Sequence, residues 1–399
     1  MSERTPTRPR LLAPFWLALL AWTAAPVWAE PPRDSGPPPV DLGTPVPVSG
    51  PAGPVRIEVA FVLDTTGSMS GLIDGARRKI WSIANRLVGN QQRSGVRIAL
   101  IGYRDRGDAY VTRRYDLTSD VDEIYGHLRE FRAEGGGDGP ESVNQALHEA
   151  VHDLSWSTAD DVYRVVFLVG DAPPHTDYGD VDFEQTARSA RRGDIFVNTI
   201  QCGSWDETAR VWQRIAALGG GRYAAIEQDG GMQAVATPLD DELAQLNREL
   251  AGTVIAYGED EQRREVASKV ARSVGAEPET AADRLSYLSK AGAGIVSGVR
   301  DLVDAVRQGL ELVDVVESEL PARLRRMAPE ERAAFIERNA AERARIKARV
   351  AELAGRRDAY LARERSRPDS GGRSEGFDAQ VFDAIEAQAR EKGITYDAH

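Results

Sequence analysis

Cysteine is almost absent from this sequence of 399 residues, and positive charge is in deficit. Its single cysteine, Cys202, excludes an internal disulfide framework and any zinc site built from several cysteines. Lysine and arginine number 50 against 62 acidic residues, so the net charge of −12 argues against a general nucleic-acid or anionic-membrane surface. The phosphate-binding patterns GxxxxGKS and GxxxxGKT are missing, so no nucleotide site of that kind is expected. Hydrophobic residues, at 42%, are sufficient for a globular core.

The first 29 residues have the features of a secretory signal peptide. Three arginines precede the apolar segment LLAPFWLALLAWTAAP, and the small residues of VWA, ending at Ala29, have the spacing of a signal-peptidase site. Cleavage after Ala29 and retention as an N-terminal anchor are the two alternatives, while two prolines argue against a membrane-spanning helix. Residues 30–54 are rich in proline and glycine and predict an exposed linker. We therefore expect a periplasmic or secreted protein whose mature chain has no transmembrane span.

Between residues 55 and 250, apolar segments of strand type alternate with segments of helical periodicity. Strands are expected at 56–64, 96–105, 110–118, 163–171, 194–202 and 221–226, with helices at 72–88, 121–131, 142–154, 183–193, 205–220 and 230–250. Continuous apolar strands separated by helices predict an α/β fold, with a doubly wound and mainly parallel sheet. In such sheets, ligands bind beyond the carboxyl ends of the strands. Asp64, Asp105 and Asp171 each end a predicted strand, which places a candidate site at that edge.

Residues 251–399 carry few strand signals and predict an α-helical C-terminal region. Amphipathic patterns cover 297–320 and 330–365. The narrow apolar stripe of the second pattern leaves two alternatives, a bundle packed within the chain or a coiled coil with a partner helix. The expected division of the chain is an α/β domain at 55–250, a helical region at 251–365, and a linker with a short helix at 366–399.

The stretch DTTGSMS, at 64–70, ends a predicted strand with an acid and a row of hydroxyls. Asp64, Thr66 and Ser68 present three oxygen ligands in one tight turn, and Gly67 permits the sharp backbone. Hard divalent cations such as Mg²⁺ accept oxygen ligands and often keep several waters. This turn therefore predicts part of a cation site, with Mg²⁺ as the expected ion and Mn²⁺ or Ca²⁺ as alternatives.

Two further loops are expected to complete this site. The loop GGGDGPE, at 135–141, presents Asp138, with Glu141 as the alternative ligand, and its three glycines allow close approach of the backbone. Asp171, in FLVGDAPPH, supplies the third contribution from the end of another strand. The predicted metal ligands are thus Asp64, Thr66, Ser68, Asp138 and Asp171.

These residues resemble the metal-ion-dependent adhesion site of von Willebrand factor type A domains. DTTGSMS is similar to the DxSxS signature of that family, with Thr66 in the place of the first serine, and GGGDGPE and Asp171 are similar to its second and third motifs. The resemblance covers about residues 56–250. It implies that Thr66 and Ser68 bind the cation directly, that Asp64 and Asp171 act through water, and that an acidic residue of a partner fills the open position.

One departure from the family pattern concerns the second motif, where many members have a threonine and this chain has the acidic GGGDGPE. A subgroup of the family is similar in this respect and pairs DTTGSM with YRD and GGGDxPE. An added acid should bind the cation more tightly and make it less electrophilic, which puts a carboxylate partner in doubt.

Three functions remain to be distinguished at this point. The first is an exported module that binds a protein or peptide through the cation. The second is a structural or assembly factor of the cell envelope, in which the cation only stabilises the loops. The third is a metal-dependent hydrolase, for which His175 or Glu141 would have to act as the base. Since no nucleophile is paired with His175 in the sequence, an enzyme is not expected.

Overall fold

The computed structural model describes residues 55–88, 95–137, 139–179, 181–232, 235–292, 294–296, 300–365 and 376–394. All of these residues belong to one compact unit, Pro47–His399. The expected signal peptide, the linker at 30–54, most of the second linker and Asp138 lie outside the described residues. Within the described ranges, no helix combines the length and apolar character that a membrane span requires.

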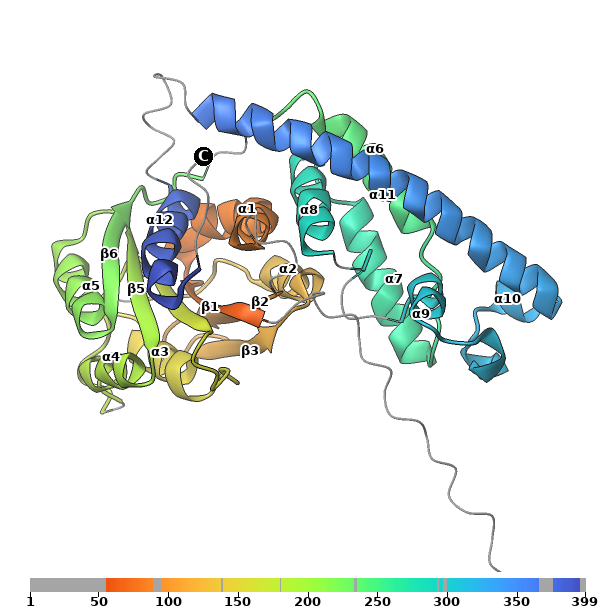
Figure 1. Ribbon diagram of the computed structural model, residues 1–399. Helices are drawn as coiled ribbons and strands as arrows, with labels where there is room; N and C mark the ends of the chain where they lie inside the picture. The colour runs from red at the N-terminus through yellow and green to blue at the C-terminus, as the bar shows by residue number, and fades with distance from the viewer. Residues whose placement is uncertain are drawn as a thin grey trace, which may run out of the picture. The chain divides into compact units, whose positions relative to one another are not determined.

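A six-stranded sheet, in the order β3-β2-β1-β4-β5-β6, confirms the predicted α/β fold (Figure 1). The strands are β1 (Val55–Asp64), β2 (Gly95–Tyr103), β3 (Thr112–Thr118), β4 (Tyr163–Gly170), β5 (Ile195–Cys202) and β6 (Gly220–Ile226). All neighbours pair in parallel except β2 and β3, which are antiparallel. The inner strands β4 and β5 are buried at every position, which explains their apolar runs at 165–169 and 195–197, whereas all but one residue of edge strand β3 are half-buried or exposed.

Side chains of β1 alternate between two cores, one on each face of the sheet. Val59, Phe61 and Leu63 belong to one core, and Ala60 and Val62 to the other. The second core is closed by α3 (Val143–His152), α4 (Phe183–Arg192) and α5 (Asp206–Leu218). The first is closed by α1 (Ser70–Val88) and α2 (Val121–Glu130), together with helices of the C-terminal region.

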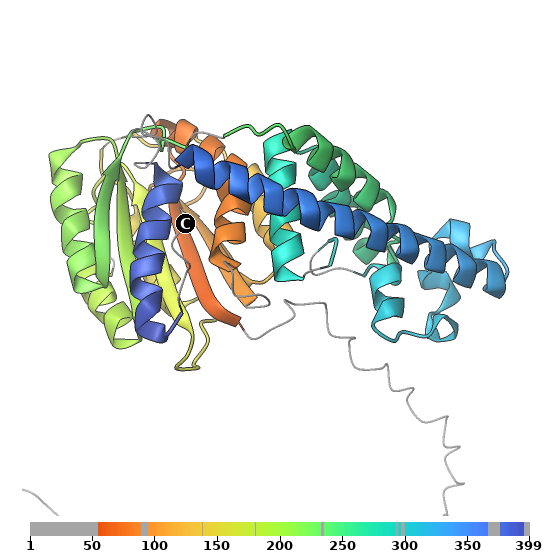
Figure 2. The same ribbon diagram turned by 45° about the horizontal axis from the view of Figure 1, so that its top comes forward.

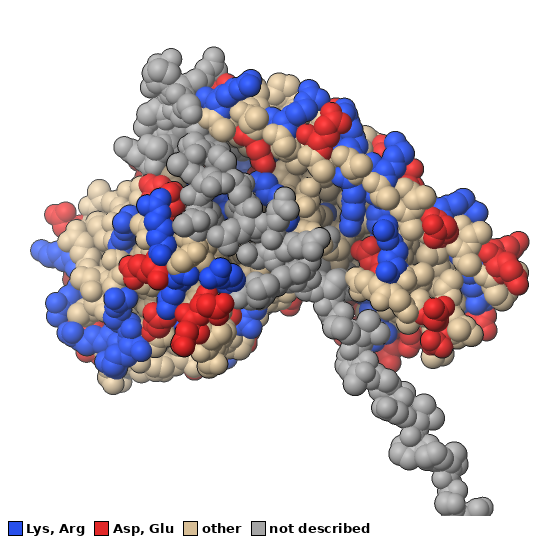
Figure 3. Space-filling view, in the orientation of Figure 1, with Lys and Arg blue, Asp and Glu red and all other residues tan. Residues whose placement is uncertain are grey.

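The C-terminal region is helical, as predicted, and packs within the chain. Helix α6 (Asp240–Gly252), the observed counterpart of the helix expected at 230–250, leads into this region. The helices that follow are α7 (Asp260–Val274), α8 (Pro278–Ala291), α9 (Leu302–Arg307), α10 (Ala322–Arg325), α11 (Pro329–Arg365) and α12 (Phe377–Ala389). Ile346, Val350 and Leu353, the stripe on α11, are buried in the same core as α8. Their burial favours the bundle over a coiled coil with a partner. On the outer side of α11, basic and acidic side chains are interspersed (Figure 3).

Two expected helices differ from those observed. The helix expected at 297–320 was wrong, since in the described part of that range, 300–320, only α9 forms as an α-helix, followed by the 3-10 helices η2 (Leu312–Asp314) and η3 (Glu317–Glu319). Asp301 caps α9 by accepting from the Val303 N–H, and Gly309, at φ 106°, takes a left-handed conformation that ends helical periodicity. The helix expected from residue 230 begins at Asp240, because Gly230 and Gly231 also have positive φ.

Helix α12 returns from the end of the chain to the sheet, beside β5 and β6 (Figures 1 and 2). The Phe377 ring lies 6.0 Å from that of Phe61 on β1, between ring centroids. Gln388 and Asn198 exchange two buried amide hydrogen bonds, of 3.0 and 2.9 Å, and the Tyr163 hydroxyl donates to Gln388 Oε1 at 2.7 Å. The short helix expected near the C-terminus is therefore part of the folded core.

Replacing Gln388 with alanine should lower the free energy of unfolding by about 1–3 kcal/mol, because Asn198 and Tyr163 would keep buried polar groups without partners. Chemical denaturation measures this change. Gln380→Ala, on the same helix but half-buried, is the control and should stay within about 0.5 kcal/mol of the wild type. If the two substitutions had equal effects, the hydrogen bonds between Gln388 and Asn198 would not be what holds α12 on the sheet.

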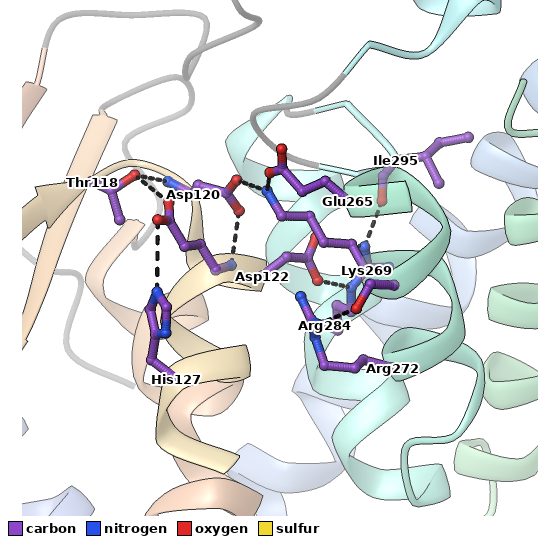
Figure 4. Close-up of polar contacts among 11 residues, drawn as sticks. Thr118, Asp120, Asp122, His127, Glu265, Lys269, Arg272, Arg284 and Ile295 are labelled. Carbon is purple, nitrogen blue, oxygen red and sulfur yellow. Dashed lines mark hydrogen bonds and ion pairs between the residues drawn. The ribbon is translucent and has the colours of Figure 1, made fainter. Parts of the chain in front are cut away.

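Two buried ion pairs connect α2 with α7 and α8 (Figure 4). Arg284 donates from Nε and Nη2 to the two carboxylate oxygens of Asp122, at 2.9 and 2.8 Å. Lys269 Nζ pairs with Asp120, which also caps α2 by accepting from the Glu123 N–H at 3.0 Å. Helix α2 precedes the glycine-rich loop at 135–141. The ion pairs with α7 and α8 therefore fix the position of the helix from which this loop starts.

Candidate metal centre

The candidate site lies at the carboxyl ends of the neighbouring strands β1 and β4. β1 ends at Asp64, and the chain passes through Thr66 into the 3-10 helix η1 (Gly67–Met69) and then α1. β4 ends at Gly170, and Asp171 follows it. Because Leu63 pairs with Val169 in parallel register, the two aspartates meet at the same edge. A side chain at Gly170 would approach Asp64 Oδ2 to 3.1 Å, so glycine at this position leaves room for the Asp64 carboxylate.

Asp64 is fully buried, and only one of its carboxylate oxygens is satisfied. Oδ1 accepts from the Thr66 N–H at 2.8 Å and from the Thr66 hydroxyl at 2.6 Å. Within the described ranges, Oδ2 has no hydrogen-bond partner. Burial raises the pKa of Asp64 to about 7, and the Asp171 carboxylate adds to this rise while the Thr66 hydroxyl opposes it. A cation beside Oδ2 would supply the missing counter-charge.

The hydroxyls of Thr66 and Ser68 lie next to this carboxylate. Thr66 Oγ1 is 3.3 Å from Ser68 Oγ, and Thr66 is buried whereas Ser68 is exposed. Asp171 is half-buried, and its Oδ2 accepts from Gln228 Nε2 at 2.7 Å. The structure thus brings Asp64, Thr66, Ser68 and Asp171 together. Gln228, just after β6, is an additional residue that the sequence did not indicate.

Glu141, the alternative ligand of the glycine-rich loop, is buried beside Asp64. Its Oε2 has no hydrogen-bond partner among the described residues. Burial raises the pKa of Glu141 to about 9, and the carboxylates of Asp64, Asp105, Asp108 and Asp171 raise it further. Asp138, the other candidate ligand of this loop, lies outside the described residues. Glu141 Oε2 is thus a second buried carboxylate oxygen without a hydrogen-bond donor among the described residues, and it belongs to the same group of carboxylates as Asp64 and Asp171.

Close backbone contacts hold the loops in place. The Glu141 N–H donates to the Pro173 carbonyl at 2.9 Å, and the His175 N–H donates to the Glu141 carbonyl at 3.2 Å. A side chain at Gly136, where φ is 77°, would come within 3.3 Å of both Glu141 Oε1 and Thr66 Cβ. The glycines therefore let the backbone pass between the DTTGSMS turn and Glu141, as the sequence predicted.

Asp108 is a positioning residue that the sequence did not indicate. Its Oδ2 accepts from the Gly136 N–H at 3.0 Å and from the Asp105 N–H at 3.2 Å. The carboxylate thus ties the loop after β2 to the glycine-rich loop. The three-residue spacing of the two acids in DRGD, which allows the second acid to accept from the backbone of the first, is the only local signal for this role.

Asp105 and His175 form a second layer beneath the candidate ligands. Asp105 accepts from the Ser142 hydroxyl at 3.0 Å and the Tyr178 hydroxyl at 2.6 Å, and His175 Nε2 lies 3.3 Å from its Oδ2. Burial would raise the pKa of Asp105, but these partners and the Arg106 backbone outweigh burial and lower it. His175 also stacks on Tyr178, with 3.8 Å between ring centroids. Its contacts with Asp105 and Tyr178 therefore help to fix the Asp105 side chain.

The donor set of this centre consists of oxygen atoms, which suits a hard divalent cation. Across the described ranges, no three His, Cys, Asp or Glu side chains form a metal-binding group. A cation here would therefore depend on the hydroxyls of Thr66 and Ser68 and on its own waters, as well as on the carboxylates.

Residues 58–237 match the family model described as von Willebrand factor A domain. An ariadne-like RING finger protein of Acanthamoeba polyphaga mimivirus is 29% identical over 120 residues, which is 30% of this chain and only 11% of that protein's length. The structure of BatB from Bacteroides thetaiotaomicron aligns over 54% of this chain and 98% of its own, with 14% identity and a TM-score of 0.33. Proximal thread matrix protein 1 from the mussel byssus, with a zinc-occupied MIDAS motif, aligns over 46% and 44%, with 18% identity and a TM-score of 0.35.

Proposed function

We propose that the chain binds a protein or peptide partner through a divalent cation, because its residues 58–237 match the model of the von Willebrand factor A domain. Asp64, Thr66, Ser68 and Asp171 would hold the ion, with Asp138 or Glu141 contributing from the glycine-rich loop. Mg²⁺ is the proposed ion, with Mn²⁺ and Ca²⁺ as alternatives, because every donor is an oxygen. When bound, the cation supplies a positive charge with a position open to an oxygen of the partner.

The observation that carries this proposal is the buried Oδ2 of Asp64, which has no hydrogen-bond partner among the described residues. A carboxylate oxygen without a donor is costly in a folded protein. Here it lies beside Asp171 and next to the hydroxyl pair of Thr66 and Ser68. Ser68 is exposed, so the same group is open toward an external ligand.

An exposed aromatic side chain at this edge supports a protein as the partner. Trp205, at the start of α5, is 43% exposed. A side chain at Gly139 would collide with its indole ring at 2.5 Å, so the ring lies against the glycine-rich loop. Tryptophan beside a polar centre is typical of protein interfaces, where it contributes a large apolar contact. We infer that the partner contacts Trp205 as well as the cation.

We also propose that the chain works outside the cytoplasm. The arginines, the apolar segment and the small-residue site at 27–29 support export, and the proline-rich stretch that follows supports a spacer between the N-terminus and the folded unit. The partner would then be a component of the cell envelope or its surroundings.

Ser68→Ala should weaken Mg²⁺ binding by about tenfold or more, because it removes a direct oxygen ligand. Isothermal titration with MgCl₂ measures the affinity, and pull-down from envelope extract with and without chelator measures capture of the partner. Ser70→Ala is the matched control, since Ser70 is an exposed hydroxyl of the same row at the start of α1. It should behave like the wild type.

Different outcomes separate the alternatives. A wild-type chain that gives no heat with Mg²⁺, Mn²⁺ or Ca²⁺ would refute the cation site. If chelator lowers the melting temperature but leaves capture unchanged, the cation is a structural element and the binding proposal fails. Capture that is lost with chelator and in Ser68→Ala, but retained in Ser70→Ala, is the expected result.

A further inference from the structure

Two of the chain's five histidines lie on one face of α3. His148 and His152 are four residues apart, a spacing that places side chains above one another on a helix. Their ring centroids are 4.6 Å apart, with the planes at 42°. His148 is half-buried and His152 is exposed, and neither ring makes a hydrogen bond or ion pair within the part of the chain that the structure describes.

We propose that His148 and His152 form a second metal site, for a transition-metal ion such as Zn²⁺, Ni²⁺ or Cu²⁺. Imidazole nitrogen is a preferred ligand of these ions, whereas Mg²⁺ and Ca²⁺ prefer oxygen. A tetrahedral ion with Zn–N distances of about 2.0–2.1 Å holds two donor nitrogens about 3.3 Å apart. Rings at the observed separation reach that spacing through side-chain rotation, and water completes the coordination.

The electrostatic surroundings favour a cation at this place. His152 is the last residue of α3, where the helix dipole attracts positive charge. Asp153, the next residue, adds negative charge beside His152.

The residues 148–152, HEAVH, have the spacing of the helical HExxH motif, in which the glutamate activates a zinc-bound water. Here the Glu149 side chain is engaged elsewhere. Its Oε1 accepts from the Thr112 hydroxyl at 2.8 Å and from Gln145 Nε2 at 2.9 Å. Among the described residues, no third His, Cys, Asp or Glu completes a group with the two histidines. The site is therefore suited to hold an ion and not to hydrolyse a peptide.

The position of the site on α3 suggests its effect. α3 begins at Val143, directly after Glu141 and Ser142 of the metal centre, and ends at His152. An ion held by residues one turn apart ties the last turn of this helix. The two sites would then occupy opposite ends of one helix, with an oxygen ligand set at its start and a nitrogen set at its end.

The test uses the full chain and ZnCl₂ in isothermal titration. To separate the two sites, the titration is made in an Asp64→Asn background, where zinc bound at the oxygen site is suppressed. His148→Ala and His152→Ala should each weaken the remaining zinc binding by about tenfold or more, since each removes one of two ligands. MgCl₂ titration of the same histidine variants, in the wild-type background, should be unchanged.

Two controls keep the test specific. His127→Ala removes a histidine on α2 that lies near Glu123 and Glu130, with no second histidine paired with it among the described residues, and should leave zinc binding unchanged. Glu149→Gln should also leave it unchanged, because the carboxylate is bound to Thr112 and Gln145. Zinc binding that survives the double variant His148→Ala/His152→Ala would overturn the proposal. So would zinc binding that vanishes with Asp64→Asn alone, or an equal loss in Glu149→Gln.

Discussion

Arg284→Ala should destabilise the protein by about 3–5 kcal/mol, because it leaves the Asp122 carboxylate buried without its counter-charge. Both side chains are almost completely buried, with exposures of 3% and 4%, and they meet through two hydrogen bonds (Figure 4). Arg284 also donates to the Ile295 carbonyl at 2.5 Å and to Asn247 Oδ1 at 3.1 Å. This single substitution therefore leaves several buried polar groups around α2 and α8 without their hydrogen-bond donor.

Urea denaturation followed by far-UV circular dichroism measures this loss. Arg345→Ala is the control, since Arg345 pairs with Glu342 on the exposed face of α11 and should change stability by at most about 0.5 kcal/mol. The double variant Asp122→Ala/Arg284→Ala should be less destabilised than the sum of the single variants, because neither charge is left unpaired. Additive effects would contradict the ion pair as the cause.

Asp64→Asn should stabilise the metal-free protein by about 1–3 kcal/mol and abolish stabilisation by Mg²⁺. Without a cation, the folded state penalises a charged Asp64, whose pKa burial raises to about 7 from the usual 3.8. Ionisation therefore costs stability as the pH rises from about 4 through 7. Asparagine keeps an oxygen for the Thr66 donors and turns an amide donor toward Asp171, so the buried charge disappears while the hydrogen bonds remain.

Denaturation with chelator and with excess Mg²⁺ gives both measurements for each variant. In the wild type, Mg²⁺ at one hundred times its dissociation constant should add about 2.7 kcal/mol. Asp105→Asn is the matched control, because Asp105 is also buried but accepts from Ser142 and Tyr178 and faces His175. It should lose stability in both conditions. A loss of stability for metal-free Asp64→Asn would show that Asp64 needs no cation.

Much of the fold follows from local patterns. The inner strands were expected because they are rich in apolar residues, and each ends within two residues of its predicted end. The positions of Asp64 and Asp171 followed as well, since parallel strands that end side by side bring their last residues to one edge. The pair of His148 and His152, by contrast, was not predicted. Its adjacent rings and the engaged Glu149 indicate what it is suited to do.

Other features depend on contacts between distant parts of the chain. The periodicity of the sequence does not predict that α12 covers the sheet, because the hydrogen bonds between the Gln388 and Asn198 amides join residues 190 positions apart. Asp108 and Gln228 were missed for the same reason, since their partners lie on other loops. The single helix expected at 297–320 was wrong. Apolar periodicity predicted it, but Gly309 has a positive φ and turns the chain there.

The sequence by itself determined the order of strands and helices along the chain and the oxygen-rich turns at the strand ends, because these depend on residue periodicity and backbone preference within a few positions. Only the tertiary structure decided which buried carboxylates face one another, which of them lack donors, and how the helical region holds α2. Those properties arise from the packing of surfaces brought together across the whole fold, where burial and charge act through space and not along the chain.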